Sequence, residues 1–329
     1  SALLVVLLPL LYFVYASAAG AGTIAFMDIV GKTVPVSRRG SFWGLRGFYG
    51  GLLALATGFL VRRTLSPEGP PFPLSYAYLY GLAAAVLVAA ASAFAAIREP
   101  VTTPPRPRQP LRQHLGQGVA LFRRDRNWRQ LYLVGLLSSL TGIGPVVYVP
   151  YAIRGLGFGE GIVGVLIVAS TACVLPANFL WSRMSDQGGN RRLYLVSNRL
   201  YLAAGVLALV SVLVPPGPAL PLLPAGWGLP AVLFLGAWIL SALAGQSRGM
   251  AATNSLLELA PEHTRPSYMA FMNVLLAPVA LVPVAAGAVV ELVSFTTAFA
   301  LSLAFGLAAH AAIRRLGEPR QSRRAAPTP

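Results

Sequence analysis

The sequence predicts an all-α integral membrane protein, and three observations carry this prediction. The chain of 329 residues is 56% hydrophobic and only 11% charged, which is about half the charged share of a soluble globular domain. Its apolar residues gather in runs of about 20, the length an α-helix needs to cross a bilayer. Its Lys and Arg residues lie between these runs, mostly on one side of the predicted membrane. A polytopic helical bundle is therefore the expected fold class.

The apolar runs number nine, so we expect about nine transmembrane helices. A β-barrel would instead need segments of about ten residues that alternate between apolar and polar positions. Runs such as LAAAVLVAAASAFAA at 82–96 do not alternate. The predicted helices lie near residues 1–27, 42–61, 75–97, 131–153, 160–182, 193–214, 229–250, 267–290 and 294–313.

The net charge of +16 raises the question of nucleic-acid binding. The positions of the cations decide against it. If the first run ends in the cytoplasm, all 26 Lys and Arg residues except Arg62, Arg63 and Arg154 fall at cytoplasmic ends or loops. This distribution follows the positive-inside rule. We therefore expect the lipid bilayer, and no nucleic acid, to be the partner of the basic residues.

Residues for metal binding or catalysis are sparse. Cys173 is the only cysteine, the three histidines (His114, His263 and His310) are far apart, and no HExxH or CxxC spacing occurs. The stretch GEGIVG at 159–164 fits GxGxxG, but a dinucleotide site needs a preceding strand. A membrane-embedded enzyme would need a nucleophile with its base, or clustered metal ligands, at membrane depth. We therefore expect no enzyme and no cofactor.

An internal repeat relates VPVSRRGSFWG at 34–44 to APEHTRPSYMA at 260–270, with a spacing of 226 residues. Each copy ends one apolar run, turns through proline and cations, and opens the next run on the same side of the membrane. The second half begins near residue 131, so a matching first half would begin about 95 residues before Ser1. The sequence therefore predicts a parallel six-plus-six repeat whose first three helices are absent from this chain. The matched pairs are Pro35 and Pro261, Arg39 and Arg265, Phe42 and Tyr268, and Gly44 and Ala270.

The repeat divides the chain into four parts. Residues 98–130 form a basic linker that opens with REPVTTPPRPRQP, and its prolines favour an extended conformation. Apolar residues in its second half have near-helical spacing, which predicts an amphipathic helix on the inner leaflet. The predicted parts are an incomplete three-helix bundle at 1–97, the cytoplasmic linker at 98–130, a six-helix bundle at 131–313 and a basic cytoplasmic tail at 314–329.

The stretch WSRMSDQGGNRR at 181–192 lies at the cytoplasmic end of the fifth run. It resembles the loop motif of the major facilitator superfamily, G-x-x-x-D-R-x-G-R-R, in its second-half copy. Asp186 matches the acid of the motif, Gly189 its second glycine, and Arg191 and Arg192 its closing cations. The departures from the motif are Ser182, Gln187 and Asn190.

The resemblance covers the chain as helices four to twelve of that family's twelve. It implies a secondary transporter that moves a small solute by alternating access. It also implies a multi-pass protein of the cell membrane, which the Arg-rich, Lys-poor composition places in bacteria, and a monomer at full length. The alternative is a non-transporting truncated remnant, or a membrane protein that depends on a partner.

The family's motif also implies an inner gate. The second-half acid lies near the start of helix five, which here begins at about Ser41, after Arg39 and Gly40. A carboxylate there would meet the positive end of a helix dipole. The hypothesis is that Asp186 closes against residues 31–44, with Arg39, Arg46 or Arg248 as partner and Arg265 in the repeated loop. The alternative is that these charges only set the topology and stay solvated.

Polar residues inside the spans are candidates for a substrate cavity. The deep parts of the spans carry almost no carboxylate, so proton coupling through an acid in these helices is not supported. The nearly uncharged spans leave the substrate undefined beyond a small molecule. Glycines in the run 42–61 indicate close helix packing, and prolines 176, 278 and 283 indicate bends. The candidate cavity residues are Asn178, Gln246, Asn254, Glu258 and Asn273.

Overall fold

The structure is a computed structural model, and all regular elements in the part of the chain it describes are helical. Most of the predicted linker at 98–130 and of the predicted tail at 314–329 lies outside the described residues. The described residues are 2–64, 69–71, 73–97, 116, 119–120, 122–123, 125–159, 162–215, 217–218, 227–260 and 265–317.

Eight helices of the described residues are long and apolar enough to cross a membrane. A further helix, α1 (Ala2–Thr33), coincides with the first predicted run. The predicted all-α polytopic fold is thereby confirmed. The other elements before the linker are η1 (Val36–Arg38), α2 (Arg39–Thr64) and α3 (Leu74–Ala95). Those after it are α5 (Arg126–Leu140), α6 (Ile143–Val146), α7 (Tyr148–Pro150), η2 (Tyr151–Gly155), α8 (Ile162–Gly188), α9 (Asn190–Leu213), α10 (Leu229–Leu259), α11 (Arg265–Leu276), η4 (Ala277–Leu281), α12 (Val282–Leu292) and α13 (Phe295–Arg315).

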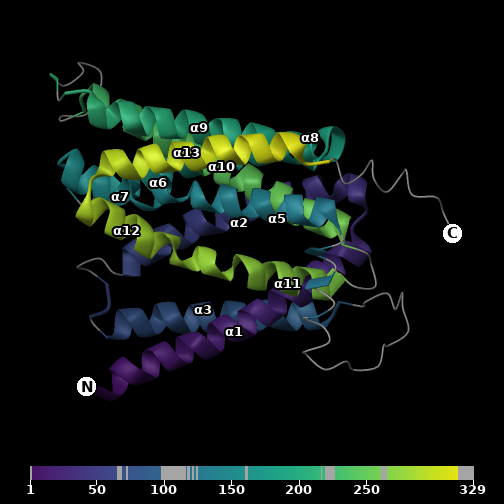
Figure 1. The fold of residues 1–329 in the computed structure, drawn as a ribbon. Coiled ribbons are helices and arrows are strands. Elements are labelled where there is room, and N and C mark those ends of the chain that lie inside the picture. The colour runs from purple at the N-terminus through teal and green to yellow at the C-terminus, as the bar shows by residue number, and fades with distance from the viewer. Residues whose placement is uncertain are drawn as a thin grey trace.

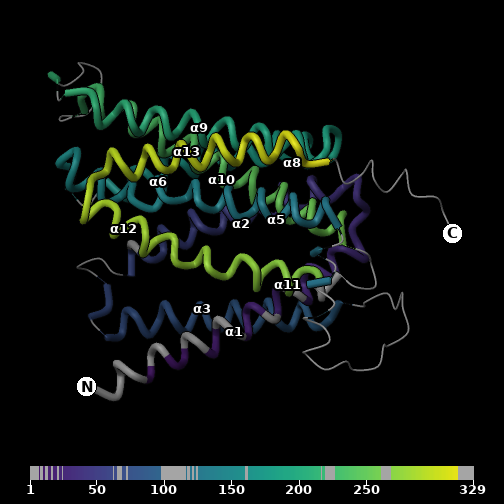
Figure 2. Tube along the Cα trace, in the orientation of Figure 1, coloured from purple at the N-terminus to yellow at the C-terminus, as the bar shows by residue number. Residues whose placement is uncertain are grey.

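The helices of the second half form one bundle, to which α2 is attached. Helix α9 packs against α10 and α13, and α2 packs along α8. In Figure 1, α9 and α13 lie at one edge of the bundle, and α3 and α1 lie at the opposite edge. The trace in Figure 2 shows that the axes of the long helices are broadly aligned with one another. The packing of α2 on α8 therefore joins a helix from before the linker to the bundle that follows it.

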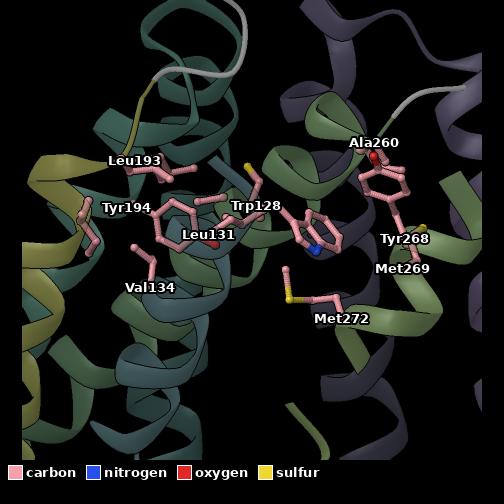
Figure 3. Close-up of a cluster of buried hydrophobic side chains, with 14 of the residues drawn as sticks. Trp128, Leu131, Val134, Leu193, Tyr194, Ala260, Tyr268, Met269 and Met272 are labelled. Carbon is pink, nitrogen blue, oxygen red and sulfur yellow. The ribbon is translucent and has the colours of Figure 1, made fainter. Parts of the chain in front are cut away.

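Two apolar clusters fill the bundle, one toward each end. One centres on Trp128, whose ring meets that of Tyr268 edge to face at a centroid distance of 4.7 Å. Figure 3 shows Trp128 between side chains of α5 and α9 on one side and Tyr268, Met269 and Met272 of α11 on the other. The second cluster holds Tyr148, Phe234 and Phe299 near the opposite end. Edge-to-face contacts add to the stability that aromatic burial provides.

Two of the predicted runs are broken helices; the apolar pattern did not reveal the breaks, although Pro278 indicated a bend in the second run. The run at 131–153 ends as α5 at Leu140 and continues through short turns to the π-helical turn η2. The run at 267–290 changes to a 3₁₀ turn at Ala277–Leu281, where Pro278 removes a backbone donor. Each still forms one candidate span. In contrast, α8 continues through Pro176.

The two copies of the repeat begin their helices at equivalent positions. Helix α2 starts at Arg39 and α11 starts at Arg265, which are 226 residues apart, the spacing of the sequence repeat. Pro35, the first of the matched prolines, lies just before η1 and α2, and its counterpart Pro261 lies outside the described residues. The equivalence places the ends of α1 and α10 and the starts of α2 and α11 in corresponding places in the two halves.

Candidate gate and cavity

The loop motif forms a tight connection between α8 and α9. Gly189 separates the two helices and has a φ of +79°. Side chains other than glycine are strained in this region, because their Cβ atom meets the backbone. The second glycine of the motif is thus required by the turn that reverses the chain. The end of the bundle that holds residues 181–192 is called the motif end below.

The carboxylate of Asp186 accepts hydrogen bonds from the first residues of α2. The backbone N–H of Gly40 donates to Oδ1 at 2.7 Å, and that of Ser41 donates to Oδ2 at 2.9 Å. The Ser41 hydroxyl also donates to Oδ2, at 2.5 Å. The first N–H groups of a helix have no partner within the helix and carry its positive dipole end. Asp186 therefore caps a helix that begins about 146 positions away in the sequence.

Glycines along one face of α2 allow this close approach. A Cβ atom at Gly44 would lie 2.7 Å from Cβ of Ser182, and one at Gly47 would lie 2.9 Å from Oδ1 of Asn178. At Gly40 it would collide with the carbonyl oxygen of Ser182. The close packing expected from the glycines is therefore present along α8. Gly58 has open space instead, so it does not belong to this contact.

The arginines expected near Asp186 contact several groups of neighbouring segments. Arg39 is buried and donates to the carbonyl oxygens of Gly31 at 2.9 Å and Val34 at 3.2 Å, which ties the loop to the end of α1. Arg46 lies over the rings of Phe26 and Trp43, at 5.6 and 5.4 Å from their centroids.

Arg248 donates to the Ser138 carbonyl oxygen and, at 3.2 Å, to Oγ1 of Thr141, and it stacks on Tyr201 at 4.6 Å. In the described residues, Arg46 and Arg248 thus contact aromatic rings and oxygen atoms other than those of Asp186. The side chain of Arg265 lies outside the described residues.

The closing cations of the motif act within the second half. Arg191 donates to the carbonyl oxygen of Arg314 at 2.8 Å, at the end of α13. A cation at a helix C-terminus is favourable because the helix dipole is negative there. The side chain of Arg192 packs beside Gly188, where a Cβ atom would lie 3.0 Å from Cδ of Arg192. These two residues therefore bind the turn to neighbouring helices of the same bundle.

A buried chain of hydrogen bonds runs beside the Asp186 contact. The indole N–H of Trp43 donates to Oδ1 of Asn254 at 2.9 Å, and the amide of Asn254 donates to Oγ of Ser185 at 3.0 Å. Ser185 in turn donates to Oδ1 of Asn190 at 2.8 Å. The chain links α2 to α10, α8 and α9. Sequence reasoning identified Asn254, as a polar residue inside a span, but missed Trp43 and Ser185.

A cavity of about 490 Å³ opens between α2, α8 and α10. Of the five predicted cavity residues, Gln246 lines it. Asn178 and Asn254 are buried at helix contacts, Glu258 is buried near the end of α10, and Asn273 is exposed on α11. The lining consists of Arg46, Gly47, Gly50, Gly51 and Ala54 of α2, Ser170, Thr171, Val174 and Leu175 of α8, and Gln246 of α10.

Comparison with known proteins agrees with the fold and with the motif. Residues 131–329 match the Major Facilitator Superfamily. The chain belongs to this superfamily. The superfamily's members share the parallel repeat of two six-helix halves. Membership of this superfamily points to a transporter rather than an enzyme.

Relatives occur in mycobacteria. Uncharacterized proteins of Mycobacterium tuberculosis and Mycobacterium bovis are each 24% identical to this chain over 302 residues. The alignment covers 91% of this chain and 56% of each relative. The chain therefore spans little more than half the length of the curated relatives that it matches. The superfamily assignment rests on residues 131–329, and the mycobacterial proteins extend the similarity into the helices before the linker.

Proposed function

We propose that this superfamily member is a secondary transporter that moves a small solute across a bacterial cytoplasmic membrane by alternating access. The observation that carries the proposal is the contact of Asp186 with the start of α2. It joins α8, in the matched bundle, to a helix that precedes the linker. Such a contact changes when two halves rock against each other, whereas a contact inside one half does not.

The contact is the closed form of a gate at the motif end, which the positive-inside rule places in the cytoplasm. Hydrogen bonds to a charged group contribute about 1.5–3 kcal/mol each. A difference of about 1.4 kcal/mol already changes a population ratio tenfold. Three bonds to a half-buried carboxylate are therefore enough to favour the closed form.

An accessibility assay tests the gate. In a Cys173→Ala background the chain has no thiol, and Thr171→Cys then places one in the cavity lining. We expect Asp186→Asn to raise the rate of labelling by a membrane-impermeant maleimide from the cytoplasmic side about tenfold. The reason is that the neutral amide loses the charge that holds the helix start.

Glu291→Gln is the matched control. It removes one negative charge from the pair with Arg154, which joins η2 to α12 within the second half at the opposite end. This variant should leave cytoplasmic labelling unchanged. Equal labelling of the parent and Asp186→Asn proteins would rule out the gate. Solute uptake by vesicles that contain the protein would then separate transport from a role that depends on a partner.

A further inference from the structure

Among the described residues that line the cavity between α2, α8 and α10, Arg46 is the only charged one. Arg46 is seven positions beyond Arg39, where α2 begins, so it lies about 10 Å along the helix. It falls within the candidate span Val36–Val61. Cations at membrane depth are costly and usually serve a function. Arg46 therefore needs an explanation beyond membrane orientation.

The contacts of Arg46 hold its guanidinium in place and leave its hydrogen-bond donors available. Its charge lies over the rings of Phe26 and Trp43. Stacking of this kind uses the face of the guanidinium plane, whereas the five N–H donors lie in that plane. The ion pairs of the described residues include Lys32 with Asp28 and Arg154 with Glu291, and neither of these involves Arg46. Arg46 is thus a positioned cation with an exposed side chain.

None of the five described acids is among the residues that line the cavity, and each lies toward the end of a helix. Asp186 is engaged at the start of α2. The remaining four are Asp28 near the end of α1, Asp125 at the N-cap of α5, Glu258 near the end of α10 and Glu291 near the end of α12. The cavity lining is otherwise neutral, with two hydroxyls and one amide as its polar side chains. The potential in the cavity is therefore positive, which favours an anion and repels a cation.

We propose that this cavity binds an organic anion whose carboxylate pairs with Arg46. The guanidinium fork matches a carboxylate in two parallel hydrogen bonds. Ser170, Thr171 and Gln246 offer further hydrogen bonds, and Val174 and Leu175 provide an apolar wall for the body of the ligand. The volume of about 490 Å³ lies in the usual range for small-molecule sites. The inference deepens the proposed function, because it names the class of solute for the same cavity.

Three compounds of the same shape test the charge preference: benzoate, neutral benzamide and cationic benzamidine. Direct binding to the purified protein in lipid nanodiscs is measured by titration calorimetry. We expect benzoate to bind at least tenfold more tightly than the other two. Binding of benzamide equal to that of benzoate, or no binding of benzoate, would overturn the proposal.

Variants then assign the effect to Arg46. R46Q should weaken benzoate binding at least tenfold, whereas R46K, which keeps the charge without the fork, should weaken it less. R183Q is the control, since Arg183 is an exposed arginine of α8 outside the cavity lining. If R46Q fails to fold because the ring stacking is lost, R46K and Thr171→Val still test the site. Unchanged benzoate affinity in these variants would overturn the assignment.

The binding test is separate from the transport test. Selective benzoate binding without uptake into vesicles would refute the transporter and keep the anion site. Uptake of a neutral solute that is unaffected by R46Q would refute the anion site and keep the transporter.

Discussion

Asp186 and Gly40 meet at 2.7 Å through a carboxylate and a backbone N–H, although they belong to helices on opposite sides of the linker. The bond does not depend on the side chain of residue 40, since glycine has none. It depends on the first residues of α2 lying within hydrogen-bond distance of the Asp186 carboxylate. The glycine face of α2 and the turn at Gly189 set that geometry, and both can be tested without altering the acid.

The glycine contact predicts a position-dependent cost of adding a methyl group to α2. Gly44→Ala places a Cβ atom 2.7 Å from Cβ of Ser182. Both Cβ atoms lie on packed helices. We therefore expect the free energy of unfolding, measured by SDS titration, to fall by about 1–3 kcal/mol. Gly58→Ala, on the same helix with open space around it, should be neutral or slightly stabilising. Equal effects of the two substitutions would show that α2 does not pack on α8 as described.

The turn at Gly189 predicts a backbone effect. Gly189→Ala forces a side chain into an extended conformation with a φ of +79° and a ψ of 162°, which costs about 1–3 kcal/mol. We expect faster unfolding and increased cytoplasmic labelling of a cavity cysteine, because Asp186 precedes this turn by three residues. The control is Gly164→Ala in the same helix as Asp186, where nothing lies near the added Cβ atom. If the Gly189→Ala protein is labelled at the wild-type rate, the conformation of this turn does not control the gate.

The bond between Trp43 and Asn254 predicts a coupling energy across the two halves. Trp43→Phe removes the indole donor and Asn254→Leu removes its acceptor. A double-mutant cycle on unfolding should give a coupling of about 1 kcal/mol, since the bond is buried. Asn198 provides the comparison, because its amide donates to the carbonyl oxygen of Gly306 within the second half. The changes in the free energy of unfolding caused by Trp43→Phe and Asn198→Leu should be additive. Strong coupling in that second cycle would indicate a general loss of packing instead of a specific bond.

The sequence was sufficient for the elements that depend on composition and periodicity. Apolar runs placed the helices, and the spacing of the repeat placed the starts of α2 and α11 at Arg39 and Arg265. The motif resemblance directed attention to Asp186 and the helix start, and the contact is found there. Its role as a gate stays a prediction, as do the four-part division of the chain and the three absent helices.

The partners of the arginines were beyond sequence reasoning. Arg46 and Arg248 lie near the expected gate along the chain, but the face from which each side chain leaves its helix decides what it contacts. Pairing by charge alone therefore favoured Asp186, whereas Arg46 stacks on rings and Arg248 binds a carbonyl oxygen. The break after Leu140 was also hidden, because an apolar run has the same pattern whether its helix continues or stops.

Arg248 donates a hydrogen bond to a carbonyl oxygen at the break after Leu140. Loss of Arg248 should therefore destabilise the bundle. The N–H of Gly142 turns to the carbonyl oxygen of Ser139 at 2.9 Å, which leaves the Ser138 carbonyl oxygen outside the α-helical pattern. Arg248 and the Thr141 hydroxyl donate to that oxygen instead. Replacing Arg248 by Met keeps much of the side-chain volume but removes the hydrogen-bond donors. We therefore expect the free energy of unfolding, measured by SDS titration, to fall by about 1.5–3 kcal/mol. Arg248→Lys should recover part of it, because an ammonium can reach one acceptor but lacks the planar stack on Tyr201. Arg183→Met, on the exposed face of α8, is the control and should unfold like the parent. If Arg248→Met also unfolds like the parent, the Ser138 carbonyl oxygen is satisfied without Arg248.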